Sequence, residues 1–364
     1  MFYGLINISM LSRGALQLAP IFIAGLLTGN PIWFRVEIVT ISTFIAAERS
    51  RLAPLGVLLH ALVVALGYLA ITSSRQTPGV FIIGSVVLAV ACIAITAAGT
   101  EMRWTGTFTF IPVLYLACAT ANNANGRALP QAAVETLPYL LFSVLPVALV
   151  SIASYRLLGK KFDGRRWFAV RQVNEAPGRG YSEGMIAAAL SVGMAASLIV
   201  WHRIHYPEWL IWSAASVVTG DVSTAIAKWK DRMVGAIVGV TTGMAVGIFL
   251  PHVPLLFDVL TAAIALTLVA FNRYVVAFGA RCAMRATRDR DYCRRTHRFV
   301  SGRTSDRRCN RQHDRHHFRA GDEFGRPVAG GAPYAIKVMS APYARPGLRP
   351  KGRVRRANTP KSEI

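Results

Sequence analysis

The sequence predicts an all-α membrane protein, a polytopic bundle of about 10–11 transmembrane helices in two related halves, followed by a disordered basic tail. Three observations support this prediction. Hydrophobic residues make up 53% of the 364 residues and gather in ten long apolar stretches. Lys and Arg fall on alternate connections between the stretches, and the apolar pattern stops abruptly after Ala283. Because a bilayer offers no water to backbone polar groups, each stretch is expected to be a helix.

Most of the ten stretches approach the roughly 20 residues that a helix needs to cross a bilayer. In chain order they are Gly14–Thr28, Ile32–Ala47, Leu52–Thr72, Gly79–Ala98, Gly106–Ala121, Thr136–Ala153, Glu183–Trp201, Trp209–Ala227, Met233–Leu250 and Pro254–Ala270. The first one is expected to be a retained helix and not a signal peptide. No clear cleavage site follows it, and another span comes at once.

The basic residues predict an orientation. With the N-terminus in the cytoplasm, the inner connections carry fifteen Lys or Arg, whereas the outer ones carry only Arg75, Arg127 and Arg203. Cytoplasmic loops of membrane proteins are enriched in Lys and Arg. The sequence therefore predicts a multi-pass protein whose N-terminus is cytoplasmic.

The chain is expected to have four parts. Residues 1–154 form a first transmembrane half of six helices, and residues 155–182 form a basic cytoplasmic linker. Residues 183–283 form a second, shortened half, in which Phe271–Ala283 begins an eleventh span. One weak internal similarity relates the halves, because Trp33 precedes Gly56 by 23 residues and Trp212 precedes Gly235 by the same interval. Parallel repeats of this kind are typical of transporters.

The fourth part, residues 284–364, holds 21 Lys or Arg against 7 acidic residues. Two interpretations are open: a disordered tail that is basic because it lies near anionic lipid, or the product of a shifted reading frame. The spacing of Cys293, His297, Cys309 and His313 differs from common zinc-site spacings, so no metal site is expected. Charge alone gives only nonspecific phosphate attraction, so no specific nucleic acid partner is expected either.

The most specific segment is a Trp-led apolar run, Trp209–Asp221, followed by the charged turn Lys228–Arg232 and a helix with regularly spaced glycines. The glycines, four residues apart, are Gly235, Gly239, Gly243 and Gly247. Small residues at this spacing share one helix face and let a second helix approach closely. The four glycines are therefore predicted to serve helix packing.

This segment resembles the fusaric acid resistance (FUSC) family of integral membrane transporters, which includes bacterial aromatic carboxylic acid exporters. The resemblance is good over Trp209–Leu250 and looser over Trp33–Ala70, where Ala53 stands in place of the Arg equivalent to Arg232. It implies a secondary exporter of aromatic or other weak organic acids in the bacterial inner membrane. Two alternatives remain open: a passive anion channel-like protein, and a nonfunctional truncated product of a transporter gene.

Four residues are candidates for substrate binding: Trp33, Arg35, Trp212 and Arg232. A guanidinium beside an aromatic ring suits an aromatic carboxylate, which it can hold by a forked hydrogen bond and ring contact. The alternative places Arg35 at the outer interface and makes Arg232 a topology anchor.

Two acidic residues are candidates for proton coupling: Glu37 and Asp221. Ionisable residues inside spans are costly and usually face a cavity or a partner. The alternatives are an interfacial Glu37 and a helix that ends near Gly220, which would put Asp221 at its end.

The sequence gives no support for catalysis. It contains no phosphate-binding loop of the G-x-x-x-x-G-K-[ST] form and no nucleophile or metal constellation typical of an enzyme. We therefore expect no enzyme activity and no cofactor. The expected partners are the lipid bilayer and a small organic anion, and a homo-oligomer is compatible with the sequence.

Overall fold

The computed structural model describes residues 4–98, 101–124, 127–157, 181–202, 204, 206–217, 222–250 and 253–288, all within one compact unit. The described residues are helical and contain no strand, which confirms the predicted all-α class. The helices are α1 (Ile8–Thr28), α2 (Ile32–Arg49), α3 (Pro54–Ser74), α4 (Pro78–Ala94), the 3-10 turn η1 (Ile95–Ala98), α5 (Met102–Asn122), α6 (Leu129–Leu157), α7 (Tyr181–His202), α8 (Pro207–Val217), α9 (Val222–Phe249) and α10 (Pro254–Ala270). Residues 274–288 are also helical.

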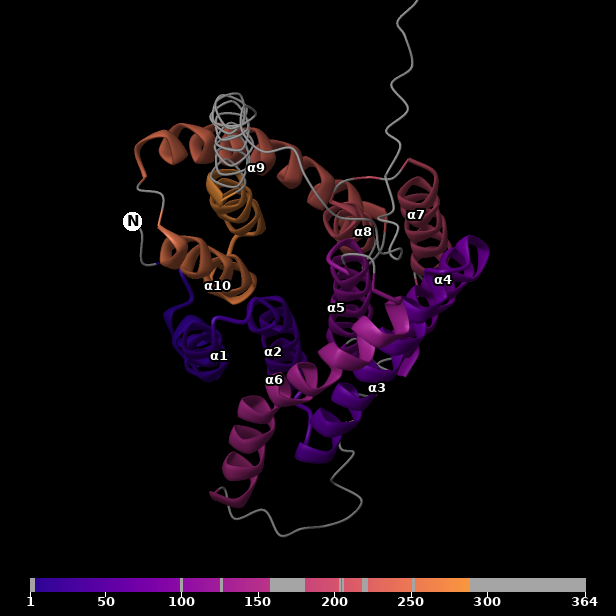
Figure 1. Ribbon diagram of the computed structural model, residues 1–364, viewed down its shortest axis with the longest axis horizontal. Helices are drawn as coiled ribbons and strands as arrows, with labels where there is room; N and C mark the ends of the chain where they lie inside the picture. The colour runs from indigo at the N-terminus through magenta and orange to yellow at the C-terminus, as the bar shows by residue number, and fades with distance from the viewer. Residues whose placement is uncertain are drawn as a thin grey trace, which may run out of the picture. The chain divides into compact units, whose positions relative to one another are not determined.

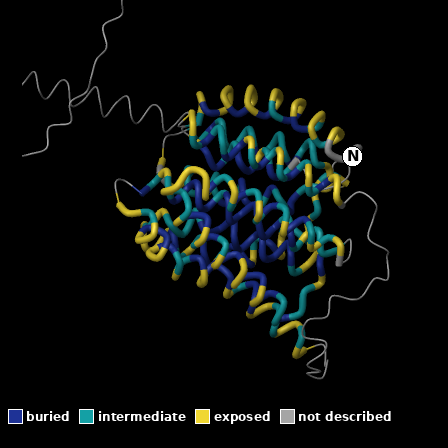
Figure 2. The backbone as a smooth tube through the Cα atoms, turned by 90° about the vertical axis from the view of Figure 1, so that its right-hand side faces the viewer, coloured by how far each residue is buried: buried dark blue, intermediate teal, exposed yellow. Residues whose placement is uncertain are grey.

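Seven of these helices are long and apolar enough to cross a membrane by length and composition: α1, α3, α4 with its 3-10 extension, α5, α6, α7 and α9. Their outward-facing residues are largely apolar, as Leu66, Ile83, Leu190 and Ile237 illustrate. Figure 2 shows exposed positions on the outer helix turns, around a buried interior. The protein is therefore a multi-pass membrane protein whose outer surface contacts lipid.

One predicted stretch is divided differently. The sequence predicts a single run over Trp209–Ala227, but α8 ends at Val217 and α9 already begins at Val222. Residues 222–227 therefore belong to the following helix. The charged turn Lys228–Arg232 lies inside α9, because Lys, Trp and Arg there are good enough helix formers to continue it. Asp221 lies outside the described residues.

Helix α2 lies between α1 and α5 (Figure 1) and packs against α1, α3, α5, α6 and α10. All eleven residues from Val36 to Ala46 are buried. The buried hydroxyl of Thr40 is satisfied, because it donates a 2.8 Å hydrogen bond to the carbonyl oxygen of Ser143 in α6. Glu37, which lies within this stretch, is therefore placed in the interior.

Contacts at the helix ends show that α2 runs antiparallel to α1 and to α5. Arg13 near the start of α1 pairs with Glu48 near the end of α2. At the same end of α2, the Arg49 guanidinium lies 5.5 Å from the ring centre of Trp104, in the first turn of α5. At the opposite end, Asn30 donates a 2.9 Å hydrogen bond to the hydroxyl of Tyr139 in α6.

Helix α9 packs backbone to backbone against the 274–288 helix. A methyl group added at Gly239 would lie 2.2 Å from the carbonyl oxygen of Gly279, and one at Gly243 would lie 2.1 Å from that of Ala283. At Gly235 the nearest atom, the carbonyl oxygen of Val275, would be 3.0 Å away. Side chains would separate the two helices at these positions.

The helix that pairs with α9 corresponds to the predicted eleventh span and is longer than predicted at its C-terminal end. The sequence expects it to be cut short at Ala283, whereas the helix continues through residue 288. The remainder of the predicted tail lies outside the described residues, as does most of the predicted linker. The division of the chain into four parts remains a prediction.

Candidate functional site

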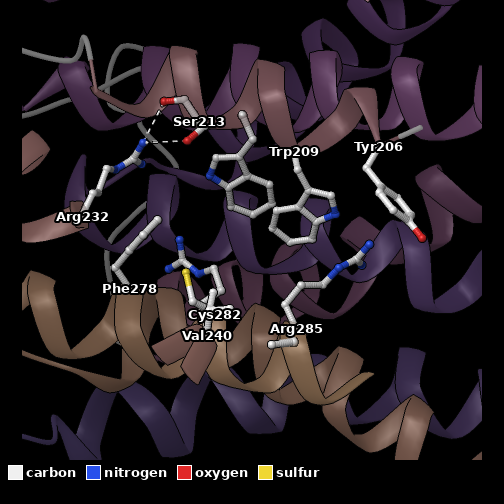
Figure 3. A pocket seen from close by; sticks show the side chains of 11 residues that line it. Tyr206, Trp209, Ser213, Arg232, Val240, Phe278, Cys282 and Arg285 are labelled. Carbon is white, nitrogen blue, oxygen red and sulfur yellow. Dashed lines mark hydrogen bonds between the residues drawn. The ribbon is translucent and has the colours of Figure 1, made fainter. Parts of the chain in front are cut away.

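A cavity of about 420 Å³ lies among α8, α9 and the 274–288 helix (Figure 3). Its lining residues are Tyr206, Trp209, Trp212, Ser213, Arg232, Val240, Phe278, Arg281, Cys282, Arg285 and Ala286. This volume falls in the range of pockets that hold small organic molecules. The described lining residues include three Arg and no Asp or Glu, so the cavity favours an anion.

Helix α8 supplies an aromatic wall. Trp209 and Trp212 are three residues apart, which places them on one helix face. Their rings stack with centres 5.6 Å apart and planes 8° apart. Tyr115 of α5 meets both rings edge-on, at centre distances of 5.8 Å from Trp209 and 5.3 Å from Trp212. Tyr115 therefore helps to fix the two tryptophan rings, which line the cavity.

Arg232 of α9 is only 6% exposed, and its guanidinium is bound on several sides. Its Nη1 donates to the carbonyl oxygen of Ser213 at 2.7 Å, and its Nη2 donates to the hydroxyl of Ser216 at 2.5 Å. Its Nε donates to the hydroxyl of Tyr274 at 2.6 Å. The side chain therefore joins three helices at one end of the cavity, where Figure 3 also shows Phe278.

Arg281 is also only 6% exposed, but its guanidinium is bound differently. Its Nε donates a 3.0 Å hydrogen bond to the hydroxyl of Thr267 in α10, and its guanidinium carbon lies 5.6 Å from the ring centre of Trp212. Among the described residues, its Nη1 and Nη2 have no hydrogen-bond acceptor. A buried cationic fork normally finds acceptors, so these donors are suited to an anion in the cavity.

Arg285 adds a third positive charge. Its guanidinium carbon lies 4.7 Å from the ring centre of Trp209 and 5.3 Å from that of Tyr206. Figure 3 shows Arg285 facing these two rings, away from Arg232. Cation–ring contacts of this kind help to fix the position of a guanidinium.

A second cavity, of about 30 Å³, shares the two tryptophans with the first. It is lined by Arg35 and Glu37 of α2, by Tyr115, Trp209 and Trp212, and by residues of α10 and the 274–288 helix. This volume is enough for about one water molecule. Glu37 is only 1% exposed, and neither carboxylate oxygen has a hydrogen-bond partner among the described residues.

The structure brings some of the predicted site residues together and separates others. Trp212 and Arg232 line the large cavity, whereas Arg35 and Glu37 line the small one, and Trp209 and Trp212 line both. Burial of Glu37 does not fit the interfacial alternative. Trp33 instead packs against α6, with its ring centre 4.9 Å from that of Tyr139 and 6.5 Å from that of Phe142.

Sequence analysis missed Trp209, Arg281, Arg285 and Tyr115 as site residues. A signal for the arginines was present: positions 281, 285 and 288 are four and three residues apart, which places them on one helix face. The predicted tail begins after Ala283, so Arg281 was assigned to the span and Arg285 and Arg288 to the tail, and their common helix face was not recognised. For Tyr115 there was no signal, because only the packing of α5 on α8 brings it to the wall.

Metal ligands do not cluster in the described part of the chain, where no group of three or more His, Cys, Asp or Glu is placed to hold an ion. The cysteines and histidines of the predicted tail lie outside this part.

Comparison with known proteins assigns the cavity region to a family model. Residues 188–286 match the model described as Fusaric acid resistance protein-like, which confirms the resemblance over this part of the chain. The matched range includes every residue that lines the large cavity. No curated protein and no solved structure matches the chain. The family match, together with the seven apolar helices, indicates a membrane transporter.

Proposed function

We propose that this protein is a secondary transporter that exports aromatic or other weak organic acids. The observation that carries the proposal is Arg281, a buried guanidinium whose two terminal nitrogens lack acceptors among the described residues and border an aromatic-lined cavity. Burying a cation without a counter-ion is costly. An organic carboxylate in the cavity supplies the missing charge and the missing acceptors.

The arrangement fits both parts of an aromatic acid. The carboxylate accepts two parallel hydrogen bonds from Nη1 and Nη2 of Arg281, the geometry that a guanidinium favours. The ring then lies against Trp209 and Trp212 on one side and Phe278 on the other. Arg232 and Arg285 raise the positive potential of the cavity and so its local concentration of anions.

Charge and topology support the proposed direction of transport and the proposed location. We place the N-terminus in the cytoplasm of a bacterial cell and the helices in its inner membrane, because the basic connections alternate. The end of α2 that carries Arg49 and the start of α5 that carries Trp104 meet, as this topology requires. A basic inner surface attracts organic anions from the cytoplasm. The sequence has no phosphate-binding loop, so an ion gradient is the proposed source of energy.

The test measures binding first. Purified protein is titrated with benzoate, with cyclohexanecarboxylate and with benzyl alcohol, and binding is followed by calorimetry. We expect benzoate to bind most tightly and the uncharged alcohol most weakly. Arg281→Gln should weaken benzoate binding by about 10- to 100-fold, since a hydrogen bond to a charged group contributes about 1.5–3 kcal/mol. Arg273→Gln, an exposed arginine of the same region, is the matched control.

Transport is then measured with 4-sulfobenzoate, whose sulfonate keeps it charged and prevents passive leakage. Everted vesicles from cells that express the protein should accumulate it, and vesicles with Arg281→Gln should not. Absence of both benzoate binding and 4-sulfobenzoate transport in the wild type would refute the proposal. A voltage-driven current that needs no counter-ion would identify a channel in place of an exporter.

A further inference from the structure

Glu37 is a buried carboxylate that no described residue neutralises by a hydrogen bond. Its side chain lies on α2 at 1% exposure, and neither oxygen accepts a hydrogen bond from a described donor. Moving an ionised carboxylate out of water is costly, and the cost falls when the group takes up a proton. Buried polar groups are normally paired, so an exception calls for a functional explanation.

The small cavity beside Glu37 gives it access to a proton. Its volume of about 30 Å³ suits one water molecule, which can donate to the carboxylate and pass on a proton. A metal ion would need several oxygen ligands, whereas the described lining residues bring a single carboxylate. A proton therefore fits the site better than a metal cation.

The charged and titratable groups around Glu37 come from four elements. Arg35 of its own helix and Tyr115 of α5 line the same cavity. Arg288 of the 274–288 helix also lines it, and both Arg288 and Asp258 of α10 interact electrostatically with Glu37. The other helices packed on α2, namely α1, α3 and α6, contribute no described residue to this lining. The charge on Glu37 therefore has close positive and negative neighbours that respond to its protonation.

The aromatic wall connects this site to the anion cavity. Trp209 and Trp212 line both the large cavity and the small one. A ring that moves to admit an anion into the large cavity therefore changes the space in the small one. The occupancy of one cavity is thus physically linked to the state of the other.

We propose that Glu37 is the proton-carrying residue of an exchange in which one proton enters the cell for each organic anion exported. The inference rests on the proposed export function. One proton from water on the outer side binds a carboxylate oxygen of Glu37, and the same proton later leaves that oxygen to water on the cytoplasmic side. The O–H bond is the bond that forms and breaks, and Trp209 and Trp212 couple each transfer to the anion cavity.

The test separates driven transport from exchange in proteoliposomes that contain the full chain. With the membrane potential clamped, a pH difference of one unit should let the wild type accumulate 4-sulfobenzoate by about tenfold. Glu37→Gln should reduce this accumulation to about onefold and abolish substrate-driven proton movement, measured with an entrapped pH dye. Exchange of labelled for unlabelled 4-sulfobenzoate at equal pH, and benzoate binding, should stay within about twofold of the wild type. Glu37→Asp, which keeps the carboxylate, should retain part of the driven accumulation.

Glu48→Gln is the matched control, because Glu48 lies on the same helix but forms a solvent-exposed pair with Arg13; it should behave like the wild type. Driven accumulation that survives Glu37→Gln would overturn the proposal. Loss of exchange and binding in both Glu37 variants, with normal thermal stability, would also overturn it, since Glu37 would then serve the anion site itself. A wild type that neither binds nor exchanges either anion would instead remove the export function on which the inference rests.

Discussion

The Nε of Arg232 donates a 2.6 Å hydrogen bond to the hydroxyl of Tyr274, forty-two residues later in the chain. The same guanidinium reaches Ser213 and Ser216 of α8 through its two terminal nitrogens. Through these bonds one side chain of α9 is connected to both α8 and the 274–288 helix, the other two elements that line the large cavity. The structure therefore gives Arg232 a part in assembling the cavity.

Arg232→Ala is expected to lower both stability and export. It removes the donor to the hydroxyls of Ser216 and Tyr274, and the loss of hydrogen bonds from a charged group should destabilise the protein by about 2 kcal/mol or more. Arg232→Lys should recover only part of this, because an ammonium group lacks the planar fork. Thermal unfolding in detergent and 4-sulfobenzoate export in vesicles measure the two effects. Lys230→Ala, an exposed neighbour, is the control. Normal stability and export in Arg232→Ala would reduce Arg232 to a topology anchor.

Trp212→Leu is expected to change selectivity more than overall affinity for acids. Aromatic contacts contribute about 0.5–1.5 kcal/mol beyond simple burial, so benzoate affinity should fall by about three- to tenfold. The affinity for cyclohexanecarboxylate should change much less, because leucine still provides an apolar surface. Calorimetric titration with both acids gives the ratio. Trp229→Leu removes an exposed tryptophan of α9 and should leave both affinities unchanged. Equal losses for the two acids would argue against ring recognition.

Gly239→Ala is expected to force α9 away from the 274–288 helix. The added methyl group would lie 2.2 Å from the backbone carbonyl oxygen of Gly279, which no side-chain rotation can relieve. Overpacking of this kind costs about 1–3 kcal/mol, so the melting temperature should fall. Gly79→Ala on α4 is the control, because no atom lies within 4 Å of the added methyl group. An unchanged melting temperature for Gly239→Ala would show that the helix pair is loosely packed.

Trp33→Phe distinguishes the sequence prediction from the structure. The structure places this ring against Tyr139 and Phe142 of α6 and away from both cavities, so benzoate affinity should be unchanged. Stability should fall modestly, by about 1 kcal/mol, through weaker packing. Calorimetry and thermal unfolding measure the two quantities. A clear loss of benzoate affinity with normal stability would support the substrate role that the sequence predicted.

The sequence by itself determined the helical class, the apolar stretches other than Trp209–Ala227, and the family resemblance over the second half. These properties are local: a helix satisfies its own backbone, and an apolar run of sufficient length specifies both helix and membrane. Local pattern also placed four glycines on one face of α9. It could not say which helix they meet, since the answer depends on the 274–288 helix that follows in the chain.

Only the tertiary structure decided which polar residues share a site. Glu37 and Trp209 lie far apart in sequence, yet both line the small cavity. Trp33 and Trp212, which looked equivalent from their spacing to a later glycine, occupy different environments, one against α6 and the other on the cavity wall. Arg232 and Arg281 are both buried, but the first has acceptors for its terminal nitrogens and the second has none among the described residues. Burial and pairing arise from contacts between distant helices, and no local pattern of residues encodes them.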